Sequence, residues 1–189
     1  NREITNKPAY EIAATGINRT FQNLKLYKSL TVLENLMVGM HMKTRQGFFS
    51  FLVNPVRTAA EERQMYEKSM EILNFIGLYK LRDEYVNNIS YGRQKMTELG
   101  RALMNDPKLL FLDEPAAGMN PQESDELMEF IHRIRDDFHL TILVIEHHMQ
   151  LVMGVCERIY VLDYGSLIAE GTPEEIQNNQ RVIDAYLGV

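Results

Sequence analysis

Four apolar residues run directly into two carboxylates in the stretch Leu109-Leu110-Phe111-Leu112-Asp113-Glu114. A short, continuous apolar run of this kind is typical of a strand in a parallel sheet with both faces covered. Ligands of open α/β sheets bind at the carboxyl ends of the strands, which is where Asp113 and Glu114 would lie. The stretch therefore predicts an α/β fold with a parallel sheet and an acidic site at a strand end.

The rest of the chain after this stretch alternates strand and helix patterns, as parallel α/β sheets do. Further strands are expected at Thr141–Ile145 and Ile159–Leu162. Between the first two strands, Asn120 supplies an N-cap and Pro121 occupies the first helical position, so a crossover helix is expected to run to about Asp137. Tyr164-Gly165 predicts a hairpin turn after the last strand, and Thr172-Pro173-Glu174-Glu175 predicts the capped start of a short helix.

The part of the chain before residue 108 carries mainly helical patterns. The run Gly16–Asn23 is the exception, because its β-branched and aromatic residues predict a strand that leads into a polar loop carrying Gln22. Thr31 and Glu34 have the spacing of a capping box, and Ala59–Leu78 places apolar residues at helical intervals. This region is expected to form a mostly helical insert.

Composition limits the class of protein. The 189 residues, 45% of them hydrophobic, are enough for one sizeable core, so we expect one globular unit. The net charge of −6 argues against a nucleic-acid partner, which normally requires clustered Lys and Arg. Cys156 is the only cysteine, so an intrachain disulfide is excluded and a reducing compartment is inferred. No apolar run approaches the ~20 residues that span a bilayer.

Asp113 and Glu114 suit the transfer of a phosphoryl group to water, which needs a metal ligand and a group that activates the water. Asp113 suits Mg²⁺ held through a bound water, because Mg²⁺ keeps much of its hydration. Glu114 suits a general base that polarises the attacking water. Taken alone, Asp113 and Glu114 are more simply interpreted as an acidic strand end that faces solvent. The neighbouring motifs must therefore distinguish this interpretation from a catalytic site.

Two further segments offer groups that could contact a phosphate. Ser90 can cap the helix that follows it, while its hydroxyl and the backbone N–H groups around Gly92 point at an anion; the alternative is an ordinary capped helix. His147 follows the apolar strand Ile142–Ile145 and could hydrogen-bond a terminal phosphate. His147 and His148 together suggest a metal site, but adjacent side chains on an extended strand point to opposite faces, and no Cys/His set completes the site.

Four short motifs in this order resemble those of the nucleotide-binding domain of ATP-binding-cassette (ABC) transporters. They are the glutamine loop at Gln22, the signature motif at Ile89–Arg93, the Walker B strand ending in Asp113-Glu114, and the switch histidine His147. Ala117–Asn120 occupies the place of the D-loop, which implies a nucleotide contact for Asn120. Each match is weak separately, but four in the correct order indicate the family. The resemblance implies a P-loop NTPase-like parallel sheet core flanked by helices, with a helical subdomain.

Within that family the chain is most similar to the ATP-binding subunits of branched-chain amino-acid importers. The runs that carry the likeness are Gly16–Asn23, Leu30–Asn35, Glu114–Pro121 and Arg181–Gly188. Two residues depart from the subgroup: Arg93 in the signature motif, and His148, where aspartate is common. The Walker A loop G-x-x-x-x-G-K-[ST] occurs nowhere in the sequence. We therefore expect a truncated domain, without Walker A and the N-terminal β-region, that binds ATP weakly on its own.

The resemblance implies an ATPase subunit that uses ATP and Mg²⁺ and lies at the cytoplasmic face of the cell membrane. Two such domains would pair head to tail, as a homodimer or heterodimer, so Ser90 and Gly92 would act in trans on the partner's nucleotide. Gln22 would sense Mg²⁺ and the water. Transmembrane permease subunits would dock on the helical lobe, about 24–107, and the α/β core from Walker B to the C-terminus would span about 108–189. Together these parts make residues 1–189 a partial ABC ATPase domain.

Two other functions remain open from the sequence. A soluble, non-transport ABC ATPase of DNA repair or translation is disfavoured, because the family's repair-type members carry a long coiled coil between the glutamine loop and the signature motif, and the interval between Gln22 and Ser90 shows no sustained heptads. A degenerate scaffold module without ATPase activity is disfavoured because Gln22, Glu114 and His147 occur together.

Overall fold

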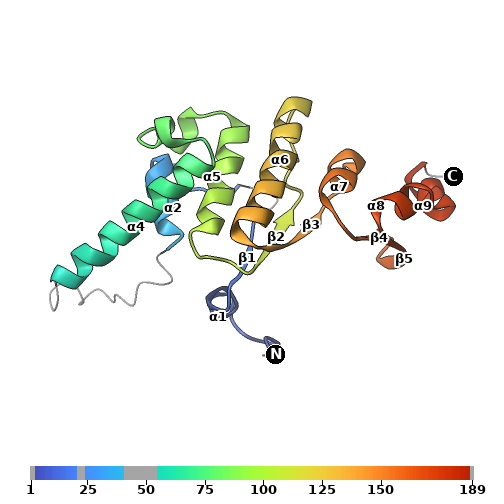
Figure 1. Ribbon diagram of the computed structural model, residues 1–189, viewed down its shortest axis with the longest axis horizontal. Helices are drawn as coiled ribbons and strands as arrows, with labels where there is room; N and C mark the ends of the chain where they lie inside the picture. Colours follow the sequence, from blue (N-terminus) through green and yellow to red (C-terminus); the bar gives the residue numbers. More distant parts are fainter. Residues whose placement is uncertain (1–2, 21–23, 41–54, 188–189) are drawn as a thin grey trace.

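The computed structural model describes residues 3–20, 24–40 and 55–187. Its centre is a parallel sheet with the strand order β1 (Ile17–Arg19), β2 (Leu109–Asp113) and β3 (Thr141–Ile145). Helix α6 (Pro121–Phe138) connects β2 to β3 and lies beside them in Figure 1. The parallel sheet and the crossover helix predicted from the sequence are therefore confirmed.

The two faces of this sheet are covered unequally. Leu110 and Leu112 of β2 are fully buried in a core formed with α5 and α6. On the opposite face, Leu143 and Ile145 of β3 remain 45% and 52% exposed and line a cleft of about 910 Å³ together with Phe111. The expectation that both faces are covered is thus wrong for the described residues, because helices pack closely on only one of them.

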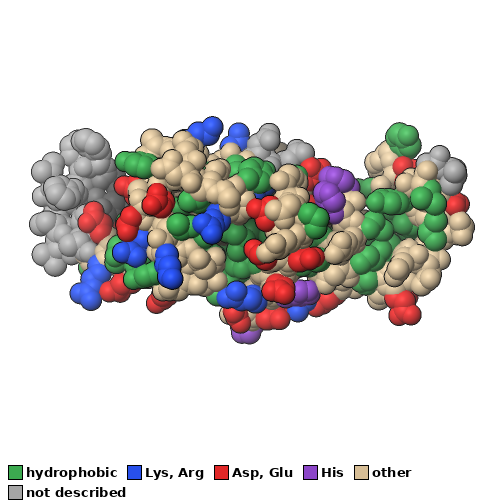
Figure 2. Space-filling view, turned by 90° about the horizontal axis from the view of Figure 1, so that it is seen from above, with side chains coloured by type: hydrophobic (Ala, Val, Ile, Leu, Met, Phe, Trp, Pro, Cys, Tyr) green, Lys and Arg blue, Asp and Glu red, His purple; other side chains and the backbone are tan. Residues whose placement is uncertain are grey.

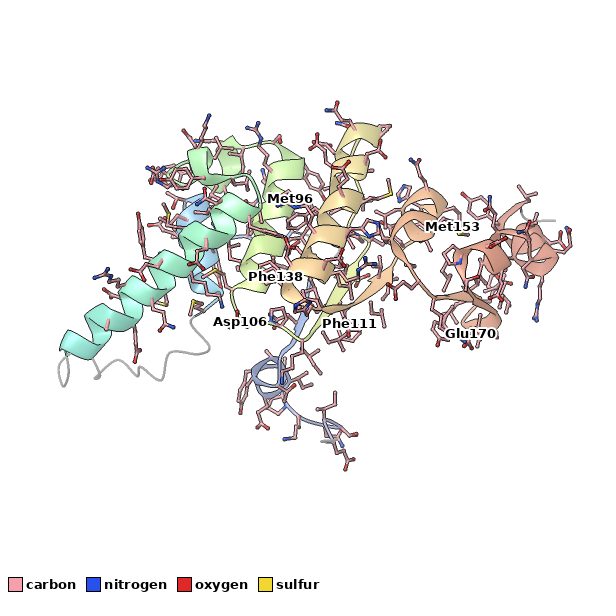
Figure 3. All side chains as sticks on the ribbon, in the orientation of Figure 1. Met96, Asp106, Phe111, Phe138, Met153 and Glu170 are labelled. Carbon is pink, nitrogen blue, oxygen red and sulfur yellow. The ribbon has the colours of Figure 1, made fainter. Side chains whose placement is uncertain are left out.

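The helical part consists of α2 (Val32–Val38), α4 (Pro55–Phe75) and α5 (Tyr91–Leu103), with short 3₁₀ turns at η1 (Tyr79–Leu81) and η2 (Val86–Asn88). These helices group at one end of the molecule (Figure 1). Lys68 of α4 forms an ion pair with Asp106, which follows α5 and is labelled in Figure 3. The predicted capping box at Thr31 and Glu34 is present, with Thr31 Oγ1 accepting from the Glu34 backbone N–H at 3.2 Å.

Buried Asn35 fastens the segment that precedes α2. Its Nδ2 donates to the carbonyls of Tyr27 at 3.1 Å and Thr31 at 2.9 Å, and its Oδ1 accepts from the Tyr27 backbone N–H at 2.9 Å. A buried amide is tolerated when its donors and acceptor are paired in this way. A further short helix, α1 (Ala9–Ala14), precedes β1 and was not predicted from the sequence.

The C-terminal part contains α7 (Met149–Val155), β4 (Ile159–Asp163), β5 (Ser166–Gly171), α8 (Pro173–Gln177) and α9 (Gln180–Leu187). The hairpin and the capped helix at Thr172 are confirmed. The expected place of β4 in the parallel sheet is wrong: within the described residues β4 pairs antiparallel with β5 in a separate sheet.

Hydrophobic side chains lie on the surface at the C-terminal end of the molecule, as Figure 2 shows. Leu162, Leu167 and Leu187 are the exposed leucines of β4, β5 and α9. Figure 3 places Glu170 of β5 at this end and Met96 of α5 nearer the helical end. In the part of the chain that the structure describes, no helix combines the length and apolar character needed to cross a membrane.

Candidate functional site

Asp113 and Glu114 lie at the carboxyl end of β2, as the sequence predicted. Asp113 is the last residue of the strand and pairs with Ile145, and the Glu114 backbone N–H donates to the Ile145 carbonyl at 2.8 Å. Glu114 has a φ of 44°, a left-handed conformation that is uncommon for a residue with a side chain. Such conformations concentrate at functional sites, where the surrounding structure holds them in place.

Asp113 is joined to the neighbouring strand by an ion pair. The Nη2 of Arg19, the last residue of β1, donates to Asp113 Oδ2 at 2.6 Å. Carboxylate oxygens at a strand end are donors that Mg²⁺ prefers, so the residues present fit this ion. Because Arg19 contacts one oxygen directly, Mg²⁺ would be held through water or would replace the arginine.

His147 lies beside Glu114 at the end of β3. Its Nδ1 is 3.7 Å from Glu114 Oε1 and 3.6 Å from Glu146 Oε2, and its side chain is 66% exposed. The structure therefore brings Asp113, Glu114 and His147 to one edge of the sheet. The exposed imidazole is accessible to a ligand that approaches this edge.

The side chains of His147 and His148 do not point to opposite faces of a strand. Strand β3 ends at Ile145, and both histidines lie in the connection to α7, with ring centroids 4.5 Å apart and planes tilted by 32°. The prediction that the two side chains point to opposite faces is therefore wrong, because the strand ends before both residues.

Glu146 fixes the position of His147 and His148 through hydrogen bonds. The sequence did not predict this role. Its fully buried carboxylate accepts from the backbone N–H groups of His147 at 2.8 Å, His148 at 3.2 Å and Ala116 at 3.1 Å. Burial by itself would raise the pKa of Glu146, but these three N–H groups, together with the hydrogen bond to the His148 side chain, outweigh it and lower the pKa below its ordinary value. The contact with Ala116 ties the histidines to the loop that follows Glu114.

Lys95 of α5 adds a buried positive charge near the strand ends. Burial lowers the pKa of the Lys95 ammonium, and nearby carboxylates, Glu98 and Glu146 foremost, act in the opposite direction. The charges of Asp113 and Glu114 contribute as well. A lysine on the buried face of an otherwise amphipathic helix was the sequence feature that could have indicated it.

The signature segment packs against the start of α6. Ser90 is the N-cap of α5, but its hydroxyl makes no capping hydrogen bond, contrary to the capping role expected for it, and the residue is exposed. Gly92 is buried, and a Cβ built on it would lie 2.7 Å from Glu123 Oε1. The glycine therefore allows the close approach of α5 and α6, whatever else it contacts.

Asn120 and Gln22 complete the set of predicted site residues. The Asn120 side chain accepts from the Glu123 backbone N–H at 3.0 Å, and Glu123 Oε2 accepts from the Asn120 N–H at 3.0 Å, so the predicted N-cap is confirmed as a capping box. Gln22 lies outside the described residues.

Comparisons with known proteins show the family of this chain. Residues 1–117 match the family profile described as ABC transporter, and residues 166–189 match the profile described as branched-chain amino acid ATP-binding cassette transporter. The chain belongs to the ABC transporter family.

Several relatives of the chain are ATP-binding proteins of branched-chain amino acid transport. The chain is 42% identical over 187 residues to the high-affinity branched-chain amino acid transport ATP-binding protein LivG of Salmonella typhimurium, covering 99% of this chain and 73% of LivG. It is 39% identical over 186 residues to BraF of Pseudomonas aeruginosa, covering 98% of this chain and 73% of BraF.

A solved structure supports the fold independently. The crystal structure of the ADP conformation of an ATP-binding cassette of an ABC transporter superposes with a TM-score of 0.80 at 31% identity. The superposition covers 100% of this chain and 75% of that one.

Proposed function

We propose that this protein is the ATP-hydrolysing subunit of an importer for branched-chain amino acids. The observation that carries the proposal is the placement of Glu114 beside His147, with 3.7 Å between Oε1 and Nδ1, at adjoining strand ends of an ABC-family chain. The names of LivG and BraF, which describe branched-chain amino acid transport, support the choice of substrate.

Each site residue receives a role in ATP hydrolysis. Glu114 acts as the general base that polarises the attacking water, and its position one residue beyond β2 places it at the sheet edge. His147, whose imidazole is exposed, donates a hydrogen bond to the terminal phosphate. Asp113 and Gln22 hold Mg²⁺, which when bound supplies charge neutralisation for the phosphates.

The remaining residues act between two ATPase subunits. Ser90, exposed at the start of α5, and Gly92 contact the nucleotide of the partner subunit, and Asn120 contacts nucleotide from the D-loop. The helical lobe, about 24–107, receives the transmembrane permease subunits, and the α/β core, about 108–189, carries hydrolysis. The assembly places the protein at the cytoplasmic face of the membrane.

The 189-residue chain by itself binds ATP weakly in this proposal. Its sequence contains no G-x-x-x-x-G-K-[ST] loop, whose backbone N–H groups cradle the phosphates in P-loop proteins. Calorimetric titration of the chain with MgATP is expected to give an affinity no tighter than about millimolar, which corresponds to roughly 4 kcal/mol. A saturating isotherm in the micromolar range would contradict this part of the proposal.

The substrate is tested in vesicles that contain the assembled transporter with its permease and binding-protein components. ATP hydrolysis should rise when leucine, isoleucine or valine is supplied and should not respond to lysine. The charged amino acid is the control because an apolar pocket discriminates against it strongly. Stimulation by lysine alone, or no hydrolysis under any condition, would overturn the proposed function.

A further inference from the structure

The side chains of Glu146, His147 and His148 converge at the start of α7. One candidate ligand atom from each of the three residues lies within 4.8 Å of the other two. This is the only group of this kind among the described residues. Glu146 contributes a carboxylate oxygen and the histidines contribute imidazole nitrogens, so the set mixes one hard donor with two of intermediate softness.

We propose that Glu146, His147 and His148 bind a transition-metal dication of the zinc class, at a site distinct from the Mg²⁺ position assigned to Asp113. Imidazole and carboxylate ligands suit Zn²⁺, Ni²⁺ and Cu²⁺, whereas Mg²⁺ prefers oxygen ligands in octahedral geometry. Three protein ligands leave a fourth position for water, as in open tetrahedral zinc sites.

Two of the three separations between ligand atoms are close to those that coordination requires, and all three lie within 4.8 Å. Zinc bonds of about 2 Å place tetrahedral ligand atoms about 3.3 Å apart. Glu146 Oε2 is 3.0 Å from His148 Nδ1 and 3.6 Å from His147 Nδ1, so these separations lie on either side of that value. An ion would replace the direct contact between Glu146 and His148.

The Glu146 carboxylate is held in place, whereas the imidazoles of His147 and His148 can rotate. The Glu146 side chain is fully buried, and backbone N–H groups of His147 and His148 orient its Oε2. Hydrogen bonds of this kind orient metal ligands in known sites. The imidazoles of His147 and His148 are 66% and 53% exposed, so they can rotate onto an ion without disturbing the core.

An ion at this site would engage the imidazole that the proposed function assigns to the terminal phosphate. Zinc is therefore expected to inhibit hydrolysis by the assembled transporter. This consequence rests on the proposed function, whereas metal binding by the chain does not, so the two can fail separately.

The binding experiment uses the complete 189-residue chain, stripped with a chelator and titrated calorimetrically with ZnCl₂ in the absence of nucleotide. We expect one saturable site, unaffected by excess Mg²⁺, and a loss of affinity of roughly 100-fold in His148→Asn. The matched control is His139→Asn, because His139 is exposed beyond α6 and its φ of 52° is tolerated by asparagine. No saturable binding, or equal affinities in wild type and His148→Asn, would overturn the site.

A second measurement uses the wild-type chain alone. The chain has five histidines, and Zn²⁺ should shift the imidazole NMR resonances of His147 and His148 while leaving those of His132 and His139 in place. Shifts confined to His132 or His139 would place the ion elsewhere and would contradict the proposal.

Discussion

The Nδ1 atom of His147 lies 3.7 Å from the Oε1 atom of Glu114, across the edge where β3 and β2 end. The two residues are far apart in the sequence and meet because their strands are parallel neighbours in register, with Asp113 opposite Ile145. The contact places a candidate base and a candidate phosphate ligand at one edge of the sheet.

His147→Asn should slow ATP hydrolysis by the assembled transporter by roughly 100-fold, because the shorter asparagine side chain withdraws the donor from the developing phosphate charge. His139→Asn, at an exposed position beyond α6, provides the matched control and should leave the rate unchanged. Steady-state phosphate release measures both variants. Equal rates in the two would remove His147 from the mechanism.

Asn35→Ala should lower the free energy of unfolding by about 2 kcal/mol, since it removes the side-chain hydrogen bonds to the carbonyls of Tyr27 and Thr31 and takes the acceptor away from the Tyr27 backbone N–H. Asn87→Ala, at an exposed position in η2, is the control and should change stability little. Urea unfolding followed by circular dichroism provides the measurement. Similar effects of both substitutions would show that the Asn35 hydrogen bonds contribute little.

Leu112→Ala should lower the free energy of unfolding by about 3 kcal/mol, because Leu112 is fully buried between the sheet and its helices. The same substitution at Leu162 of β4, which is 66% exposed, removes the same atoms from a solvated position and should cost far less. Chemical denaturation of the two variants makes the comparison. A larger loss at Leu162 would contradict the assignment of the core.

Ionisation of Glu98 should lower the free energy of unfolding as pH rises above 4.5, the ordinary pKa of a glutamate side chain. Burial raises its pKa above that ordinary value and outweighs the opposing effects of the Lys25 backbone N–H and of Lys95 and Arg101. Between the unfolded and folded pKa values the folded state binds more protons, so its stabilisation is greatest at low pH and is lost as pH rises through the folded pKa.

Glu98→Gln should remove this dependence, because the amide does not titrate. The measurement is the difference in unfolding free energy between wild type and variant, from pH 4.5 to neutrality. Glu129→Gln, an exposed substitution on α6, corrects for the general change in charge. If the variant does not become more stable relative to wild type as pH rises, burial is not the dominant effect on the pKa of Glu98.

Local patterns allowed much of the fold to be predicted. The capping boxes at Thr31, Asn120 and Thr172 depend on residues three positions apart, and all three are present. The pairing of β4 was not predictable in the same way, since an apolar run does not specify whether its partner is a parallel or an antiparallel strand.

The sequence predicted the site residues that lie at strand ends. It did not predict those whose role depends on contacts between distant parts of the chain. Asp113, Glu114 and His147 follow apolar runs, which the sequence displays. Glu146 was missed because its role depends on a hydrogen bond to Ala116, 30 residues earlier in the chain. The orientation of His148 was missed because strand boundaries are known from sequence only to within a few residues.

The most direct test of the account is Glu114→Gln in the assembled transporter, with nucleotide binding and steady-state hydrolysis measured on the same preparation. Glutamine keeps the size of the side chain but cannot accept the proton, so hydrolysis should fall roughly 10²- to 10⁴-fold while ATP binding is retained. The exposed Glu129→Gln is the matched control and should hydrolyse ATP at the wild-type rate. Unchanged hydrolysis in Glu114→Gln would contradict the assignment of Glu114 as the catalytic base.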